Sequence, residues 1–272
     1  MTQHPSTEPM IMTVTGPIPP DELGITDAHT HTWIEPVAGT PPGLPLLFDQ
    51  ISIIAELIEY RESGGGSLVD CQPGGCGRNG EIIRELSRLS GVRIVACTGF
   101  HLRRYYPANA WIYRPQIGAE AACCYFVEEI TTGLRETQDL VQPVRAGFIK
   151  IACETDINQV PAHLMEAAAI AGLETGVAIE VHTEKGADAE KIAQRFEQHG
   201  FPLTRLVLCH IDKRPDFALH AELARAGVTL EYDTFYRPKY DPDQNVWPLL
   251  EQMATAGLSN RIAIATDMAE AA

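Results

Sequence analysis

Eight short apolar runs alternate along the chain with seven segments of helical periodicity, and this alternation restricts the fold more than any other feature of the sequence. The runs are continuously hydrophobic, which is typical of parallel strands covered on both faces. The expected strands are 25–31, 67–71, 92–98, 146–152, 177–182, 206–210, 228–232 and 262–267. The expected helices are 49–62, 79–90, 119–137, 162–174, 187–199, 217–226 and 246–256, the first of them capped by Asp49. Eight β/α units in 272 residues predict a (β/α)8 barrel.

A doubly wound open sheet is the alternative fold, but it usually needs fewer strands. The stretch 75–80 does match the pattern Gly-x-Gly-x-x-Gly after an expected strand. A dinucleotide site also needs an acidic residue about 20 positions further on. That zone reads Gly99-Phe100-His101 and contains no acid, so dinucleotide binding has little support.

The chain divides into a short lead-in and one domain. We expect residues 1–22 to form a mobile lead-in with a short hairpin near 16–20, and residues 23–272 to form the barrel. No helical pattern follows the last expected strand, so the last helix of the barrel is expected to be missing from the chain.

Charge and cysteine content restrict the partners and the compartment. A net charge of -15 argues against nucleic acid and anionic membranes as partners. No run of 18 apolar residues and no signal-peptide pattern occur. The 7 cysteines are odd in number and form no Cys-x-x-Cys pair, which favours reduced thiols and a cytoplasmic location.

Metal-binding types of side chain occupy the ends of five expected strands. Functional residues of such barrels gather at these C-terminal ends. A lone histidine there is more often structural than a ligand, but several in one barrel are hard to explain by packing. The residues concerned are His29, His31, Lys150, His182, His210 and Asp267.

The order His-x-His, Lys, His, His and Asp over the first, fourth, fifth, sixth and eighth strands resembles the amidohydrolase superfamily, and within it the phosphotriesterase family. The segments GVRIVACTGFH, AGFIKIACE, ETGVAIEVHTEKG and LVLCHIDKRPD are each similar to family segments. The resemblance covers about 23–268. It implies a homodimer and a metal-dependent hydrolase.

The resemblance further implies a binuclear metal centre, usually zinc, although manganese, cobalt and iron accept the same ligands. His29, His31 and Asp267 would hold the more buried ion, and His182 and His210 the more exposed one.

Lys150 would carry a carbamate derived from CO2 and bridge the two ions, together with a hydroxide. A neutral lysine amine in a desolvated site can add CO2, whereas an ammonium cannot bind a cation. The alternative is a plain barrel lysine paired with a carboxylate.

The expected mechanism is attack by the metal-held hydroxide, because two cations lower the pKa of a bridging water to about 7 or below. The exposed metal would polarise the substrate oxygen. Asp267 would accept the proton and pass it toward the leaving group, so Asp267 and Lys150 are the expected catalytic residues.

Three loops concentrate basic and aromatic side chains at the expected barrel mouth of an acidic protein. Arginine forks match phosphate and carboxylate oxygens, which favours a small anionic substrate. The alternative is pairing with local acids such as Asp212, Asp216 and Asp233. The candidates for substrate binding are His101, Arg103, Arg104, Tyr105, Lys213, Arg214, Tyr236, Arg237 and Lys239.

The segments CQPGGCGRN, TGFH and HIDKRPD are more similar to family members acting on sugar lactones, some of them phosphorylated. The resemblance therefore implies a lactonase that acts on a sugar lactone, either phosphorylated or not. Hydrolysis of a phosphotriester, carboxylic ester or amide at the same centre is one alternative. A metal-loaded binding protein without catalysis is another.

Overall fold

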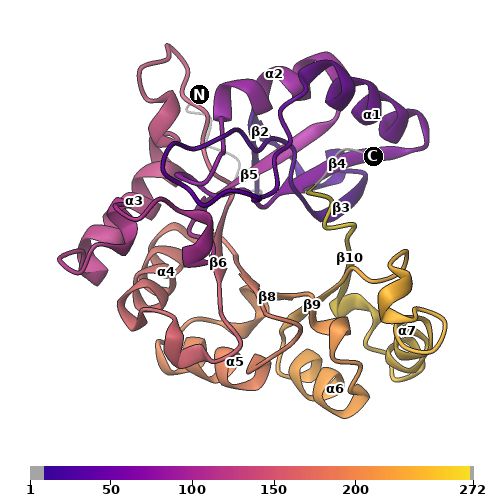
Figure 1. Ribbon diagram of the computed structural model, residues 1–272. Coiled ribbons are helices and arrows are strands. Elements are labelled where there is room, and N and C mark those ends of the chain that lie inside the picture. The colour runs from indigo at the N-terminus through magenta and orange to yellow at the C-terminus, as the bar shows by residue number, and fades with distance from the viewer. Residues whose placement is uncertain (1–8, 270–272) are drawn as a thin grey trace, which may run out of the picture.

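The computed structural model describes residues 9–269, and its central feature is a sheet of eight parallel strands curled into a barrel (Figure 1). The strands neighbour one another in chain order, and every ladder between them is parallel. The predicted (β/α)8 barrel is thereby confirmed. The strands are β3 (Ile25–Thr30), β4 (Gly65–Asp70), β5 (Arg93–Gly99), β6 (Phe148–Ala152), β7 (Ile179–His182), β8 (Leu206–Cys209), β9 (Thr229–Tyr232) and β10 (Ile262–Ile264).

Seven α-helices of the described residues surround the strands (Figure 1). They are α1 (Gln50–Glu62), α2 (Gly80–Ser90), α3 (Ala119–Thr131), α4 (Ala162–Thr175), α5 (Ala189–Gln198), α6 (Phe217–Arg225) and α7 (Val246–Thr255). The carboxylate of Asp49 caps α1 as predicted, since it accepts hydrogen bonds from the amides of Ile51 and Ser52.

Helix α3 is shorter than the expected helix 119–137. It ends at Thr131, and a separate 3-10 turn follows at Arg135–Thr137. β-branched residues and glycine at 131–133 disfavour further helix. The amide of Leu134 bonds the carbonyl of Val144, 2.6 Å away, and so cannot continue the helical ladder.

The segment that follows the last strand, residues 266–268, closes the barrel against the C-terminal end of the first strand. The amide of Asp267 donates to the carbonyl of His29 at 2.8 Å, and the amide of His31 donates to the carbonyl of Met268 at 2.9 Å. The amide and hydroxyl of Thr266 both donate to the carboxylate of Asp27. The two ends of the chain that carry predicted metal ligands are therefore held side by side.

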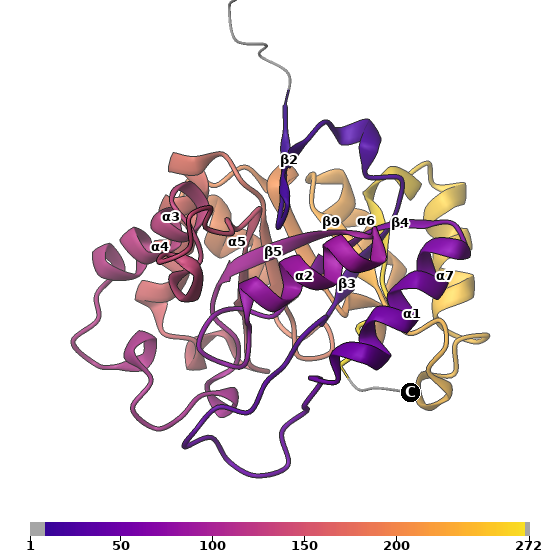
Figure 2. The same cartoon turned by 90° about the horizontal axis from the view of Figure 1, so that it is seen from above.

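The lead-in packs against the barrel instead of moving freely from residue 11 onward. Strands β1 (Ile11–Thr13) and β2 (Gly16–Ile18) pair as an antiparallel hairpin beside the barrel (Figure 2). Val14 is buried, and its amide donates to the carbonyl of Ile94, near the start of β5. The hairpin thus lies at the N-terminal end of the strands, opposite the predicted site. Residues 1–8 of the lead-in fall outside the described residues.

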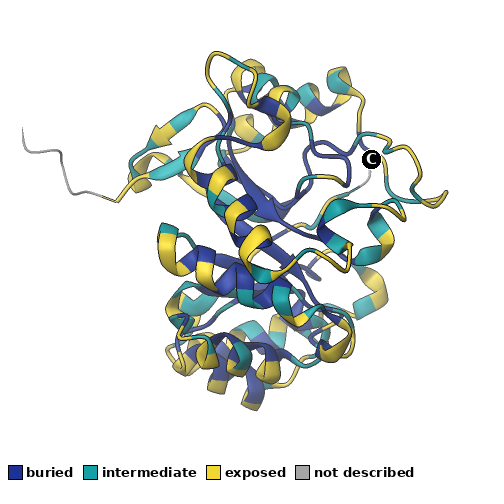
Figure 3. Ribbon diagram, turned by 90° about the vertical axis from the view of Figure 1, so that its left-hand side faces the viewer, coloured by how far each residue is buried: buried dark blue, intermediate teal, exposed yellow. Residues whose placement is uncertain are grey.

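The hydrophobic core lies between the strands and the inner faces of the helices (Figure 3). Within the described residues, no helix follows β10. Ile25 and Ile264, on the first and last strands, are 71% and 54% exposed. None of the described helices is long and apolar enough to cross a membrane.

Candidate metal centre

The structure brings all of the predicted metal ligands together at the C-terminal end of the barrel. The ring centres of His29 and His31 lie 5.6 Å apart, those of His29 and His210 4.9 Å, and those of His182 and His210 4.7 Å. Asp267 Oδ1 lies 3.7 Å from His29 Nε2 and 4.0 Å from His31 Nε2. Lys150 Nζ lies 3.2 Å from His29 Nε2.

Two of these residues adopt a backbone conformation that non-glycine residues rarely take. His210 has φ +62° and Asp267 has φ +49°, and each directly follows a strand or its extension. Such left-handed positions cost about 1–3 kcal/mol and persist where the surroundings impose them. Here they turn the two side chains toward the other ligands.

Three further side chains orient the imidazoles. His31 Nδ1 lies 2.7 Å from Gln72 Oε1, and His29 Nδ1 lies 2.8 Å from Glu231 Oε2. His210 Nδ1 hydrogen-bonds Asp233. An acceptor at Nδ1 fixes the tautomer of a metal-binding histidine and frees Nε2 as the ligand atom. In His29 and His31, Nε2 faces Asp267 accordingly.

The donor set fits a metal centre. Imidazole nitrogens and carboxylate oxygens are ligands of zinc and related ions. The donor atoms of His29, His210 and Asp267 lie within 4.8 Å of one another, as do those of His210, Glu231 and Asp233. His182 Nε2 is buried without a hydrogen-bond partner in the described chain. A buried polar atom left unpaired in this way is costly unless a ligand satisfies it.

Burial keeps most of the imidazoles in the form that binds metal. It lowers the pKa of His31 to about 3, with the neighbouring charge of His29 acting in the same direction. Burial likewise lowers the pKa of His182 and holds that of His210 well below its ordinary value. These three rings are therefore neutral at neutral pH, with a free lone pair.

The groups around Lys150 favour its protonated ammonium form. Its Nζ atom donates to Glu180 Oε1 at 2.9 Å and lies 3.8 Å from Cys209 Sγ. Burial opposes the charged form, but the neighbouring acidic groups, among them the carboxylates of Glu180 and Glu231, outweigh burial and hold the pKa of Lys150 well above its ordinary value. Lys150 is therefore an ammonium at neutral pH in the metal-free protein.

A cavity of about 530 Å³ opens beside the metal ligands. Its lining includes the predicted ligands His31, His182 and Asp267 and apolar side chains of the loop 34–46. The structure brings four of the nine substrate-binding candidates into this lining: His101, Tyr105, Arg237 and Lys239. Arg237 also donates to Asp267 Oδ2 at 3.0 Å.

The other five candidates lie outside the lining of this cavity. Lys213 Nζ is close by, 3.0 Å from Asp233 and 3.7 Å from Asp267. Arg103 donates to three backbone carbonyls of its own loop. Arg104 pairs with Glu154 and Glu184, and Arg214 pairs with Glu190. Tyr236 is 87% exposed. Pairing with local acids, the alternative raised from the sequence, therefore describes Lys213, Arg104 and Arg214.

Sequence reasoning missed the residues that support the ligands. Glu180 and Glu231 are buried inside otherwise apolar strands, and Gln72 and Asp233 follow strand ends. A charged residue inside an apolar run was the available signal, because a buried carboxylate requires a partner.

Comparison with known proteins matches residues 9–272 to a family model described as the phosphotriesterase family. A relative named phospho-furanose lactonase from Mycoplasmopsis synoviae is 28% identical, over 94% of this chain and 75% of its own. The crystal structure of an amidohydrolase from Mycoplasma synoviae has a TM-score of 0.85 and 27% identity, over 96% of this chain and 77% of its own. A lactonase from Listeria monocytogenes has a TM-score of 0.87 over 96% of this chain and 83% of its own. At 23% identity, that likeness concerns the fold alone.

Proposed function

Because this chain belongs to the phosphotriesterase family, a family of metal-dependent hydrolases, we propose that it opens a lactone ring by hydrolysis and that the lactone carries an anionic group such as phosphate. One observation carries the proposal: predicted metal ligands and the basic side chains Arg237 and Lys239 line the same cavity. The relative named phospho-furanose lactonase supports this substrate class.

We propose zinc at two positions, with His29, His31 and Asp267 at one and His182 and His210 at the other. Two such ions would supply a water of lowered pKa and polarise the carbonyl oxygen of the lactone. A carbamate on Lys150 would bridge them. Before Lys150 can add CO2 it must release its proton, and Glu180 lies 2.9 Å away as an acceptor.

Asp267 is the proposed proton carrier. Its carboxylate oxygens face His29, His31 and His210 at 3.7 to 4.0 Å, so it borders the place where water attacks. Asp267 would take a proton from the attacking water as the new C–O bond forms at the carbonyl carbon. It would return that proton to the ring oxygen as the ring C–O bond breaks, which yields a hydroxy acid.

Arg237 and Lys239 are the proposed anion binders. One guanidinium nitrogen of Arg237 donates hydrogen bonds to the carboxylate of Asp267 and to the backbone carbonyls of Thr266 and Asp267. The remaining N–H donors of Arg237 can reach a ligand in the cavity. A phosphate or carboxylate on the substrate would therefore be held within reach of the proton carrier. The two basic groups also compensate locally for the net charge of -15.

A substrate panel tests the proposal. The zinc-loaded enzyme is assayed with a phosphorylated furanose lactone, its dephosphorylated form, a neutral aliphatic lactone and an aryl phosphotriester. We expect the highest kcat/KM for the phosphorylated lactone. A preference for the phosphotriester, or for a carboxylic ester or amide, would replace the lactonase by one of these alternatives. Metal binding without turnover of any of them would favour a binding protein.

A further inference from the structure

Polar side chains fill the barrel interior one layer below the predicted ligands, where barrels of this fold normally carry branched aliphatic residues. Cys71 follows β4, Glu180 lies in β7, Cys209 ends β8 and Glu231 lies in β9. All four are buried, and we call them the floor cluster. None of them belongs to the predicted binuclear ligand set.

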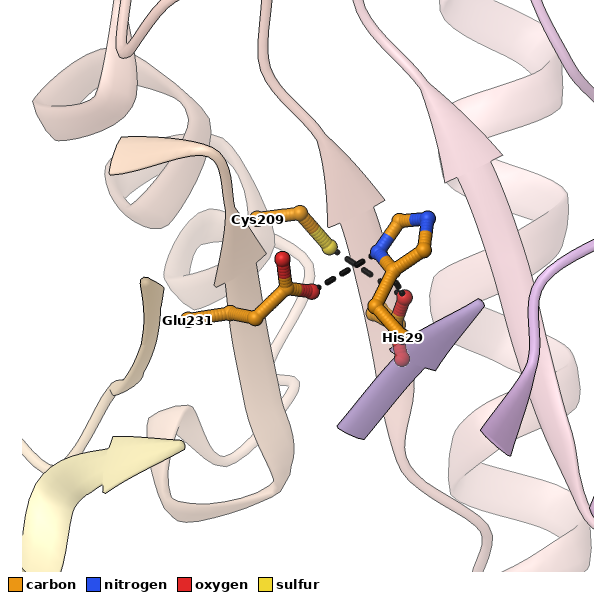
Figure 4. A group of neighbouring side chains, drawn as sticks. His29, Cys209 and Glu231 are labelled. Atoms are coloured by element: carbon orange, nitrogen blue, oxygen red, sulfur yellow. Dashed lines mark hydrogen bonds and ion pairs between the residues drawn. The ribbon is translucent and has the colours of Figure 1, made fainter. Parts of the chain in front are cut away.

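The donor atoms of the floor cluster converge. Glu180 Oε1 lies 2.8 Å from Cys71 Sγ and 3.2 Å from Cys209 Sγ. Figure 4 shows Cys209 and Glu231 directed at the ring of His29, whose Nδ1 atom lies 2.8 Å from Glu231 Oε2. Donor atoms of His29, Glu180, Cys209 and Glu231 all lie within 4.8 Å of one another. Ligands of a tetrahedral ion at 2.0–2.3 Å are about 3 to 4 Å apart, so small side-chain shifts would enclose one ion.

The two carboxylates of the floor cluster rely on positive charge that loading of the upper centre would remove. In the metal-free protein this charge comes from the ring of His29, which contacts both carboxylates, and from Lys150, whose Nζ atom lies 2.9 Å from Glu180. If Lys150 becomes a carbamate, that positive charge is replaced by a negative one. Glu231 Oε1 is in addition fully buried and has no hydrogen-bond partner in the described chain. Buried carboxylates without a cation or donor are strongly unfavourable.

We propose that the floor cluster is a third cation site, which takes one thiophilic divalent ion such as Cd²⁺ or Zn²⁺. Cys209, Glu180, Glu231 and the Nδ1 atom of His29 would be its ligands, with Cys71 as an adjacent thiol. Thiolate selects such ions over harder ones, and one thiolate, one imidazole and two carboxylates complete four-coordination. His29 would release its Nδ1 proton, and Cys209 its thiol proton, to solvent as the ion binds. The resulting imidazolate would bridge this ion to the upper centre through its two ring nitrogens. This inference rests on the proposed binuclear centre in one respect only, which is the total number of ions that the protein is expected to bind.

Titration of the chelator-treated protein with Cd²⁺ tests this site, because a cadmium–thiolate bond adds ultraviolet charge-transfer absorption. We expect three equivalents and this absorption in the wild type. Cys209→Ser should remove the absorption and one equivalent. Cys153→Ser, which changes a buried cysteine outside the cluster, and Cys124→Ser, which removes the exposed thiol, should keep both.

A second variant covers the case in which Cys209→Ser does not fold. Glu231→Gln keeps both thiols, the side-chain volume and an oxygen acceptor for His29, and it should weaken the equivalent that gives thiolate absorption by about 10- to 100-fold. Circular dichroism of the cadmium-free variants verifies the fold. Two equivalents without thiolate absorption, or absorption that survives Cys209→Ser, would overturn the site. Thiolate absorption in a protein that hydrolyses no lactone would overturn the proposed function instead.

Discussion

The amide of Asp267 donates a hydrogen bond of 2.8 Å to the carbonyl of His29, and this contact closes the barrel and joins the two ends of the predicted ligand set. The carboxylate of Asp267 lies 3.7 Å from the ring of the same histidine. Closure of the barrel and assembly of the metal centre therefore depend on the same pair of residues, which are 238 positions apart in the sequence (267 − 29).

Asp267→Asn should abolish proton transfer while leaving an oxygen in place to bind metal. We expect kcat for the lactone to fall by about 10²- to 10⁴-fold, the usual contribution of a general acid–base group. Metal content by mass spectrometry serves as the control for occupancy. Retention of near-normal kcat with full metal content would exclude Asp267 as the proton carrier.

Gln72→Ala should weaken metal binding without touching a ligand. Gln72 Oε1 holds His31 Nδ1 at 2.7 Å, and loss of such an orienting acceptor typically costs about 10- to 100-fold in metal affinity. Gln72→Glu keeps an acceptor and is the matched control. Competition with a chelator of known affinity measures the change, and equal affinities for the two variants would refute this role for Gln72.

Lys239→Ala should raise KM for the phosphorylated lactone by about tenfold, as expected for loss of one charge-assisted contact worth about 1.5 kcal/mol. The KM for the dephosphorylated lactone should stay unchanged. Arg214→Ala removes a basic side chain that pairs with Glu190 outside the cavity, and it should change neither value. Steady-state kinetics with both substrates decides, and an equal loss for both would show that Lys239 binds no anion.

Acid should destabilise the protein after its metals have been removed by chelation. The folded-state pKa of His31 is lowered to about 3 from 6.5, so the unfolded chain binds the extra proton first as the pH falls. This contribution to stability is complete above pH 6.5 and is lost progressively toward pH 3. Its slope approaches about 1.4 kcal/mol per pH unit for one group. Urea unfolding measures the free energy of unfolding at each pH. Between pH 7 and pH 5 this free energy should fall less for His31→Gln than for the wild type.

Bicarbonate should promote reconstitution of the chelated enzyme with zinc, if Lys150 carries a carbamate. Glu180 holds Lys150 as an ammonium, which cannot react with CO2. We expect slow recovery of activity in CO2-free buffer and fast recovery after bicarbonate is added. Lys150→Glu, which supplies a permanent carboxylate, should bind zinc equally well in both buffers. Recovery of the wild type at one rate in both buffers would contradict the carbamate.

The sequence predicted most strands well because they are largely apolar runs bounded by turn residues. The helices were equally visible, apart from the end of α3, where a backbone contact between Leu134 and Val144 overrides the helical pattern. The six predicted ligands could be named because strand ends meet at one face of a barrel whatever the details of packing. The expected homodimer concerns a second chain and remains a prediction, which sedimentation can test.

The substrate-binding candidates were less accessible to sequence reasoning. Arg103 and Arg237 are both basic loop residues and look alike in the sequence. Only the folded loops direct Arg103 to backbone carbonyls and Arg237 into the cavity. Loop conformation depends on contacts between distant segments, which no local pattern records.

By itself, then, the sequence determined the barrel fold and the types of side chain at the C-terminal ends of its strands, since hydrophobic periodicity and residue type are local properties. Tertiary structure alone decided which groups face one another across the interior. Glu180 and Glu231 lie on two different strands, and each contacts His29, which lies on a third strand. Contacts of this kind follow from the closure and register of the barrel. The left-handed backbone at His210 and Asp267 is likewise imposed by the folded surroundings, because the isolated chain would avoid it.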